Sequence, residues 1–178
     1  MITLKDKSFV PYLSDVQIQN RIKEMGETLR KDYEGKNPLF ICVLNGAFVF
    51  SADLIRALKM DVEITFIRVS SYDEMQSTGN VKELLGLKEN IFGRDIVLIE
   101  DIVDSGITLS HLEEVFNDLG PKSVKVVSLL HKPESQTKAK TPDYIGFSIP
   151  SKFVVGYGLD YDGLGRGLPE IYQLHQDA

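Results

Sequence analysis

Apolar positions recur with helical spacing in three segments of the chain. From Ile18 to Leu29 they are spaced by four, three and four residues, which predicts a helix over 14–34. Ser14, followed three residues later by Gln17, forms a candidate capping box at its start. The same pattern predicts two further helical segments, 45–59, where a turn comes first, and 108–120.

Short runs of a different kind lie between and after these helices. LFICVL is apolar at every position and suits a strand buried on both faces, whereas VEITFIRVS alternates and is rich in β-branched residues. The predicted strands are 38–44, 62–70, 96–101, 123–131, 144–149 and 153–159. Because strands alternate with helices, we expect an α/β fold in which helices flank a mainly parallel, twisted sheet. No linker or repeat divides the chain, so we expect a single domain, 1–178, to which the two chain ends add a small hood or flap.

Composition narrows the class of protein. The chain has 178 residues, of which 43% are hydrophobic, enough for a sizeable core. Its net charge of −6 argues against a nucleic-acid-binding surface, which is usually basic. Cys42 is the single cysteine, so no internal disulfide can form and a reducing compartment is indicated. The N-terminus lacks a signal pattern and no apolar run is long enough to span a membrane, so we expect a cytoplasmic protein with no membrane partner.

One stretch, VLIEDIVDSGITLS at 97–110, concentrates the candidate chemistry. Glu100 and Asp101 stand side by side at the predicted carboxyl end of a strand, where parallel sheets bind ligands. The following segment, 104–108, supplies two hydroxyl groups, a glycine for a tight turn and the start of a helix, which together suit an anion. A phosphorylated sugar bound with Mg²⁺ would fit both parts. The alternative is that Asp104 or Ser105 merely caps the helix.

The segment VLIEDIVDSGIT resembles the phosphoribosyl pyrophosphate (PRPP) signature of the type I phosphoribosyltransferases. The resemblance implies the type I phosphoribosyltransferase fold. It also implies that Glu100 and Asp101 hold ribose hydroxyls, directly or through Mg²⁺, and that Asp104 is the general base. The residues implied to bind the 5′-phosphate are Asp104, Ser105, Gly106, Ile107 and Thr108.

The rest of the chain resembles the hypoxanthine-guanine phosphoribosyltransferases of bacterial size. The loop LNGA at 44–47 would bind pyrophosphate through Asn45 and Gly46, although many relatives have lysine in place of Asn45 and only a backbone role carries over. Ser71 and Tyr72 resemble part of a lid that closes on the same pyrophosphate. The plainer interpretations are an ordinary strand-to-helix turn and a surface loop.

Two later motifs resemble the purine side of that family. Lys132, after a predicted strand, would donate to the purine 6-oxo group; otherwise it is a surface lysine. In KFVVGYGLDYDG, Phe153 would stack on the base and Val154 would meet its edge, or both would pack in the core. Asp160 would serve the purine side and Mg²⁺, or be a solvated acid. Arg166 would clamp pyrophosphate in a stretch, DGLGRG, that is richer in glycine than in relatives.

The resemblance implies purine salvage, in which 5-phosphoribosyl is transferred from PRPP to N9 of hypoxanthine or guanine with Mg²⁺ as cofactor. IMP or GMP and pyrophosphate would be the products, and a homodimer or homotetramer would be the assembly. Two alternatives remain open at this point. One is an enzyme that prefers xanthine, and the other is a regulator with the same fold that senses PRPP or nucleotides.

Overall fold

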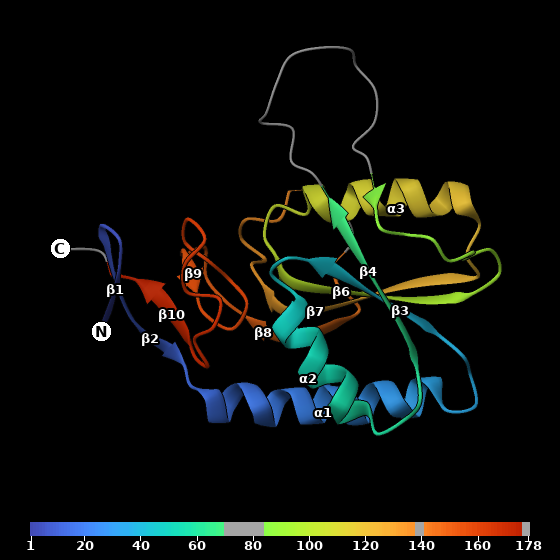
Figure 1. The fold of residues 1–178 in the computed structure, drawn as a ribbon, viewed down its shortest axis with the longest axis horizontal. Coiled ribbons are helices and arrows are strands. Elements are labelled where there is room, and N and C mark those ends of the chain that lie inside the picture. Colours follow the sequence, from blue (N-terminus) through green and yellow to red (C-terminus); the bar gives the residue numbers. More distant parts are fainter. Residues whose placement is uncertain (70–83, 138–140, 176–178) are drawn as a thin grey trace, which may run out of the picture.

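A computed structural model describes residues 1–69, 84–137 and 141–175 of the chain. Its larger layer is a six-stranded sheet in the order β5-β4-β3-β6-β7-β8 (Figure 1). The strands are β3 (Leu39–Leu44), β4 (Glu63–Val69), β5 (Leu84–Leu85), β6 (Asp95–Val103), β7 (Ser123–His131) and β8 (Tyr144–Ser148). All neighbouring pairs are parallel except β4 and β5. The predicted parallel sheet is therefore confirmed.

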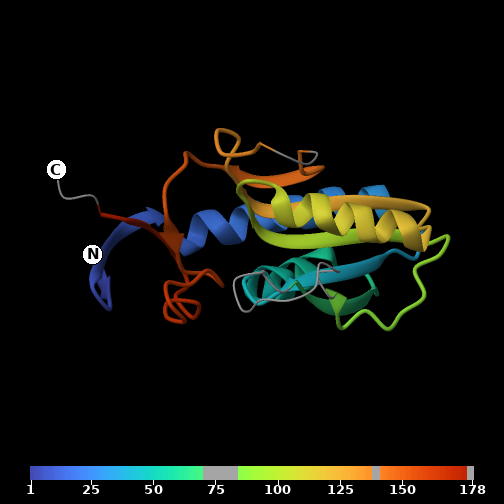
Figure 2. The same cartoon turned by 90° about the horizontal axis from the view of Figure 1, so that it is seen from above.

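Helices cover both faces of this sheet (Figures 1 and 2). They are α1 (Asp15–Tyr33) and α2 (Phe48–Leu58) on one face and α3 (Ile107–Leu119) on the other. Since side chains alternate along a strand, Val97 and Ile99 of β6 pack with α1 and α2, whereas Leu98 packs with α3. The strands at the centre are consequently apolar on both faces, as the sequence pattern indicated.

Individual residues of the sequence determine where α1 begins and how closely α2 packs against it. The Ser14 hydroxyl accepts from the Gln17 amide at 3.4 Å, and the Gln17 side chain accepts from the Ser14 amide at 3.0 Å. The predicted capping box is thus confirmed. Gly26 of α1 lets α2 approach closely, because a Cβ there would lie 2.9 Å from the backbone of Ala57.

The two chain ends form a second, antiparallel sheet in the order β1-β2-β10-β9. Its strands are β1 (Ile2–Leu4), β2 (Lys7–Leu13), β9 (Val154–Val155) and β10 (Ile171–Leu174). This sheet lies beyond the ends of β7 and β8 and pairs β2, from the start of the chain, with β10, from near its end (Figure 1). It is the small hood expected from the chain ends.

Two predicted strands differ from the structure by more than one residue at an end. The strand expected at 153–159 stops at Val155, because Gly156, Tyr157 and Gly158 all adopt positive φ, at 101°, 51° and 99°. The strand expected to end at Asp101 continues to Val103 through pairing with β7. Among the described residues, no helix has both the length and the apolar character needed to cross a membrane.

Candidate active site

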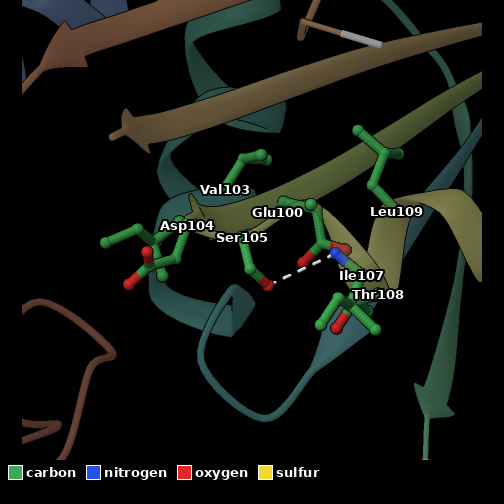
Figure 3. Close-up of a pocket in the computed structure, with 9 residues that line it drawn as sticks. Glu100, Val103, Asp104, Ser105, Ile107, Thr108 and Leu109 are labelled. Atoms are coloured by element: carbon green, nitrogen blue, oxygen red, sulfur yellow. Dashed lines mark hydrogen bonds between the residues drawn. The ribbon is translucent and has the colours of Figure 1, made fainter. Parts of the chain in front are cut away.

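The side chains of the two adjacent acids of β6, Glu100 and Asp101, lie on different sides of the strand. Glu100 lines a pocket beside the start of α3 (Figure 3). Asp101 instead lies against the loop that precedes α2. A Cβ at Gly46 would stand 1.5 Å from Oδ2 of Asp101, so any larger residue there would displace that carboxylate. Neighbouring residues of a strand face opposite sides of the sheet, which is why adjacency in the sequence separates these two side chains.

The turn between β6 and α3 lines a pocket that encloses about 330 Å³ of space open to solvent (Figure 3). Its lining includes all five residues of 104–108. Gly106, with φ of 81°, is the N-cap of α3 and has no side chain to satisfy the first amides of the helix. The Ser105 hydroxyl accepts from the Ile107 amide at 3.4 Å. The geometry is that of an anion-binding helix N-terminus.

Glu100 adds an unusual electrostatic feature to this pocket. Its residue is 6% exposed, and Oε1 has no hydrogen-bond partner among the described residues. Burial, reinforced by the charge of Asp101, raises the pKa of Glu100 well above its ordinary value. Burial also raises the pKa of Asp101 to about 6, although its backbone hydrogen bonds and Arg166 oppose that rise. Perturbed carboxyl groups of this kind gather at ligand-binding sites.

Lys132 is not the surface lysine of the plainer interpretation. Its side chain is 9% exposed, and its ammonium group lies 2.6 Å from Oδ2 of Asp104. The Lys132 amide donates to the Val103 carbonyl at 2.9 Å, which fixes the residue beside the end of β6. This ion pair also shows that the Asp104 carboxylate does not cap α3. No sequence pattern predicted this pairing, because the two residues are 28 positions apart.

The hood brings an aromatic group to the same edge of the large sheet. Phe153 is 45% exposed, and its ring packs edge-on against Tyr161 at 5.9 Å and lies 6.3 Å from Phe9. The loops after β7 and β8 are joined by the hydroxyls of Ser135 and Ser151, 2.5 Å apart. Lys132 and Phe153 therefore follow neighbouring strands whose ends are tied together. Val154 is buried in the hydrophobic core, so only its backbone is available to a ligand.

Asp160 and Arg166 meet across the glycine-rich turn. Arg166 forms an ion pair with Asp160 at 2.6 Å and donates to the Gly158 carbonyl at 2.7 Å. The Gly163 amide also donates to Asp160, at 2.7 Å, so this carboxylate organises the turn rather than standing solvated and unpaired.

The same segment reaches the loop before α2. A Cβ at Gly158 would lie 2.1 Å from the Gly46 carbonyl oxygen, and the peptide between Leu44 and Asn45 is cis. The structure thus gathers Asn45, Gly46, Asp101 and the Asp160–Arg166 pair into one region. Gly158 was not among the predicted site residues, although the paired glycines of VGYGL were a signal for close backbone approach. Ser71 and Tyr72 lie outside the described residues.

Comparison with known proteins agrees with this geometry. A model of the phosphoribosyl transferase domain matches residues 13–162. The chain is 46% identical over 160 residues to the hypoxanthine-guanine phosphoribosyltransferase of Bacillus subtilis, covering 89% of each protein. It is 45% identical to a bifunctional protein named TilS/HprT from Listeria innocua, of which it spans 25%.

A solved structure has the same architecture. The crystal structure of a hypoxanthine-guanine phosphoribosyltransferase from Bacillus anthracis superposes with a TM-score of 0.85 at 41% identity. The match covers 96% of this chain and 99% of that one. The fold is therefore the type I phosphoribosyltransferase fold that the sequence predicted. The chain belongs to the phosphoribosyl transferase domain family and, within it, to the hypoxanthine-guanine phosphoribosyltransferases.

Proposed function

We propose that the protein transfers the 5-phosphoribosyl group of PRPP to N9 of hypoxanthine or guanine in purine salvage. The products would be IMP or GMP and pyrophosphate. The observation that carries this proposal is the buried Lys132 ammonium beside Asp104, at the rim of the anion pocket formed by 104–108. A donor, an acceptor and a phosphate site in this order match the 6-oxo group and the N7 proton of the incoming purine base and the 5′-phosphate of PRPP. The named relatives support the same assignment.

The purine end would work through four groups. Lys132 would donate to the 6-oxo group, which an ammonium can do only toward an acceptor and not toward the amino group of adenine. Asp104 would take the N7 proton as N9 attacks the sugar, as a general base. Phe153 would stack on the base, and the Val154 backbone would meet its edge.

The pyrophosphate end would work through the region around Gly46. Departure of pyrophosphate concentrates negative charge, which the planar guanidinium of Arg166 suits. The backbone of Asn45 and Gly46 would contribute amide donors without a lysine charge. Ser71 and Tyr72 would belong to a lid that excludes water from the reacting sugar.

The carboxylates fit Mg²⁺ as a bound cofactor. The described residues contain no ready-made cluster of three or more His, Cys, Asp or Glu ligands. Mg²⁺ is commonly held by one or two carboxylates together with substrate phosphates and water, so a complete protein cage is not required. Asp101, with its pKa raised by burial, and Asp160 are close enough to interact electrostatically, and Glu100 has an unpaired oxygen. Asp101 and Asp160 would hold the ion, which would neutralise charge on the leaving pyrophosphate. Glu100, expected from the sequence to share this ion, instead faces the pocket formed by 104–108.

The test is pyrophosphate release from PRPP and Mg²⁺ with hypoxanthine, guanine, xanthine, adenine or uracil as acceptor. We expect turnover with hypoxanthine and guanine and none with adenine or uracil. Turnover fastest with xanthine would replace the proposed substrate, because the Lys132 ammonium serves any 6-oxo group. PRPP binding without turnover of any base would point to a regulator and contradict the proposal.

A further inference from the structure

Tyr157 is a buried side chain that the proposed chemistry does not use. It is 2% exposed, and its hydroxyl donates to Oδ2 of Asp53 in α2. Gln19 of α1 donates to the same carboxylate oxygen at 3.1 Å and to the Tyr157 hydroxyl at 3.4 Å. Burial, with the Asp53 carboxylate, raises the pKa of Tyr157 above its ordinary value, so the hydroxyl remains a donor. A residue of the C-terminal loop is therefore fixed between the two helices of one face.

The backbone on either side of this side chain leads directly to Arg166. The Tyr157 amide donates to the Leu168 carbonyl at 2.8 Å, and the Gly158 amide donates to the Arg166 carbonyl at 2.9 Å. The Arg166 guanidinium returns a bond to the Gly158 carbonyl at 2.7 Å. A shift of residue 157 would move the backbone of Arg166 and the atom that orients its guanidinium.

Through Asp53, the Tyr157 side chain is also connected to the loop that contains Asn45 and Gly46. Asp53 lies in α2, which begins immediately after this loop. Gly158 already touches this loop, because a Cβ added there would lie 2.1 Å from the Gly46 carbonyl oxygen. The Tyr157–Asp53 bond therefore ties the C-terminal loop to α2, the helix that follows the Gly46 loop. The C-terminal loop and the Gly46 loop each border the region around Asp101.

We propose that Tyr157 is a positioning residue for the pyrophosphate end of the site, acting through its hydrogen bond to Asp53. The inference rests on the proposed function for its substrate, PRPP. Loss of this bond should affect the pyrophosphate end of the site and leave the purine end unchanged. Loss of the bond loosens Arg166 and the Gly46 loop, while Lys132 and Asp104, held by β6 and β7, keep their geometry.

The test compares two Tyr→Phe variants of the full chain. Tyr157→Phe removes the bond to Asp53, which keeps Gln19 and Arg56 as partners, so the fold should survive. Tyr144→Phe is the matched control, because Tyr144 donates to Asp32 at 2.7 Å and likewise joins an element to α1, away from the site. A hydrogen bond to a charged group is worth roughly tenfold or more in an equilibrium constant. We expect KM for PRPP to rise about tenfold in Tyr157→Phe, with KM for hypoxanthine unchanged, and neither to change in Tyr144→Phe.

Hydrogen exchange provides a readout that does not depend on activity. The amides of Tyr157 and Gly158 should exchange faster in Tyr157→Phe than in the wild type or in Tyr144→Phe. An equal rise of both KM values in Tyr157→Phe, or unchanged exchange at these amides, would overturn the positioning role. If the wild type failed to bind PRPP, the proposed function would fall, and the exchange rates alone would still decide whether Tyr157 holds the loop.

Discussion

Replacement of Asp101 by Asn should make the ligand-free protein more stable while impairing its reaction. Burial raises the pKa of Asp101 from its usual 3.8 to about 6, so the folded state pays a penalty whenever this carboxyl group is ionised. The difference of about two units corresponds to about 3 kcal/mol in the free energy of unfolding. For a chain of this length, that is a rise in Tm of roughly 6–12 °C. Asn keeps an oxygen that can accept from the Ile102 amide, the bond that Asp101 makes at 2.7 Å.

The sign of the pH dependence sharpens this prediction. Because the folded state binds the Asp101 proton more tightly than the unfolded state, the wild type loses stability as pH rises from about 4 through about 6. The Asn variant lacks this loss, so the stability difference between the two proteins should be near zero at pH 4 and reach its plateau above pH 7. Loss of the Asp101 charge also lowers the pKa of Glu100, which adds to the gain.

The assay is urea unfolding of both proteins without Mg²⁺ at a series of pH values, with catalysis measured in parallel at pH 7.5. A variant no more stable than the wild type at pH 8 would refute the reasoning. So would a gain of equal size at pH 4 and pH 8, because it would have a cause other than ionisation of a buried carboxyl group.

Three further predictions concern individual parts of the site. Asp104→Asn should retain the fold and lose about 10²–10⁴-fold in kcat, the usual loss for a general base; near-normal kcat would show that Asp104 is not the base. Lys132→Ala should reduce the preference for hypoxanthine over adenine in kcat/KM by about tenfold to hundredfold, since a charge-assisted bond is lost; an unchanged ratio would remove Lys132 from base recognition. Gly46→Ala should raise KM for PRPP by about tenfold or more, because its Cβ would collide with Asp101, whereas Gly167→Ala, with open space around it, should match the wild type.

The part of the fold that the sequence predicted is the part set by local patterns. The capping box at Ser14 joins residues three positions apart, and the central strands are uniformly apolar, so both can be read directly. The hood strands β2 and β10 escaped individual prediction because they pair with each other across nearly the whole chain, as Phe9 does with Leu174. The edge strand β1, which pairs only with β2, was not predicted either. The strand expected at 153–159 was wrong because its glycines serve a turn of positive φ.

The candidate site was likewise predictable where it rests on contiguous sequence and not where it depends on residues that only folding brings together. The segment 104–108 is contiguous, so its motif indicated one anion site, and in the structure all five residues line one pocket. Glu100 and Asp101 are adjacent in the sequence, and we expected them to serve the same ligand groups. The strand directs their side chains to different sides. The Lys132–Asp104 and Tyr157–Asp53 contacts join residues 28 and 104 positions apart, and only the folded chain brings them together.

The central claim is that this chain makes a 6-oxopurine nucleotide from PRPP. The most direct measurement is a competition in which the protein, PRPP and Mg²⁺ meet equal amounts of hypoxanthine, guanine, xanthine and adenine, with the nucleotides formed identified by mass spectrometry. We expect IMP and GMP to accumulate and AMP not to form. AMP as the main product, or no nucleotide at all, would contradict it.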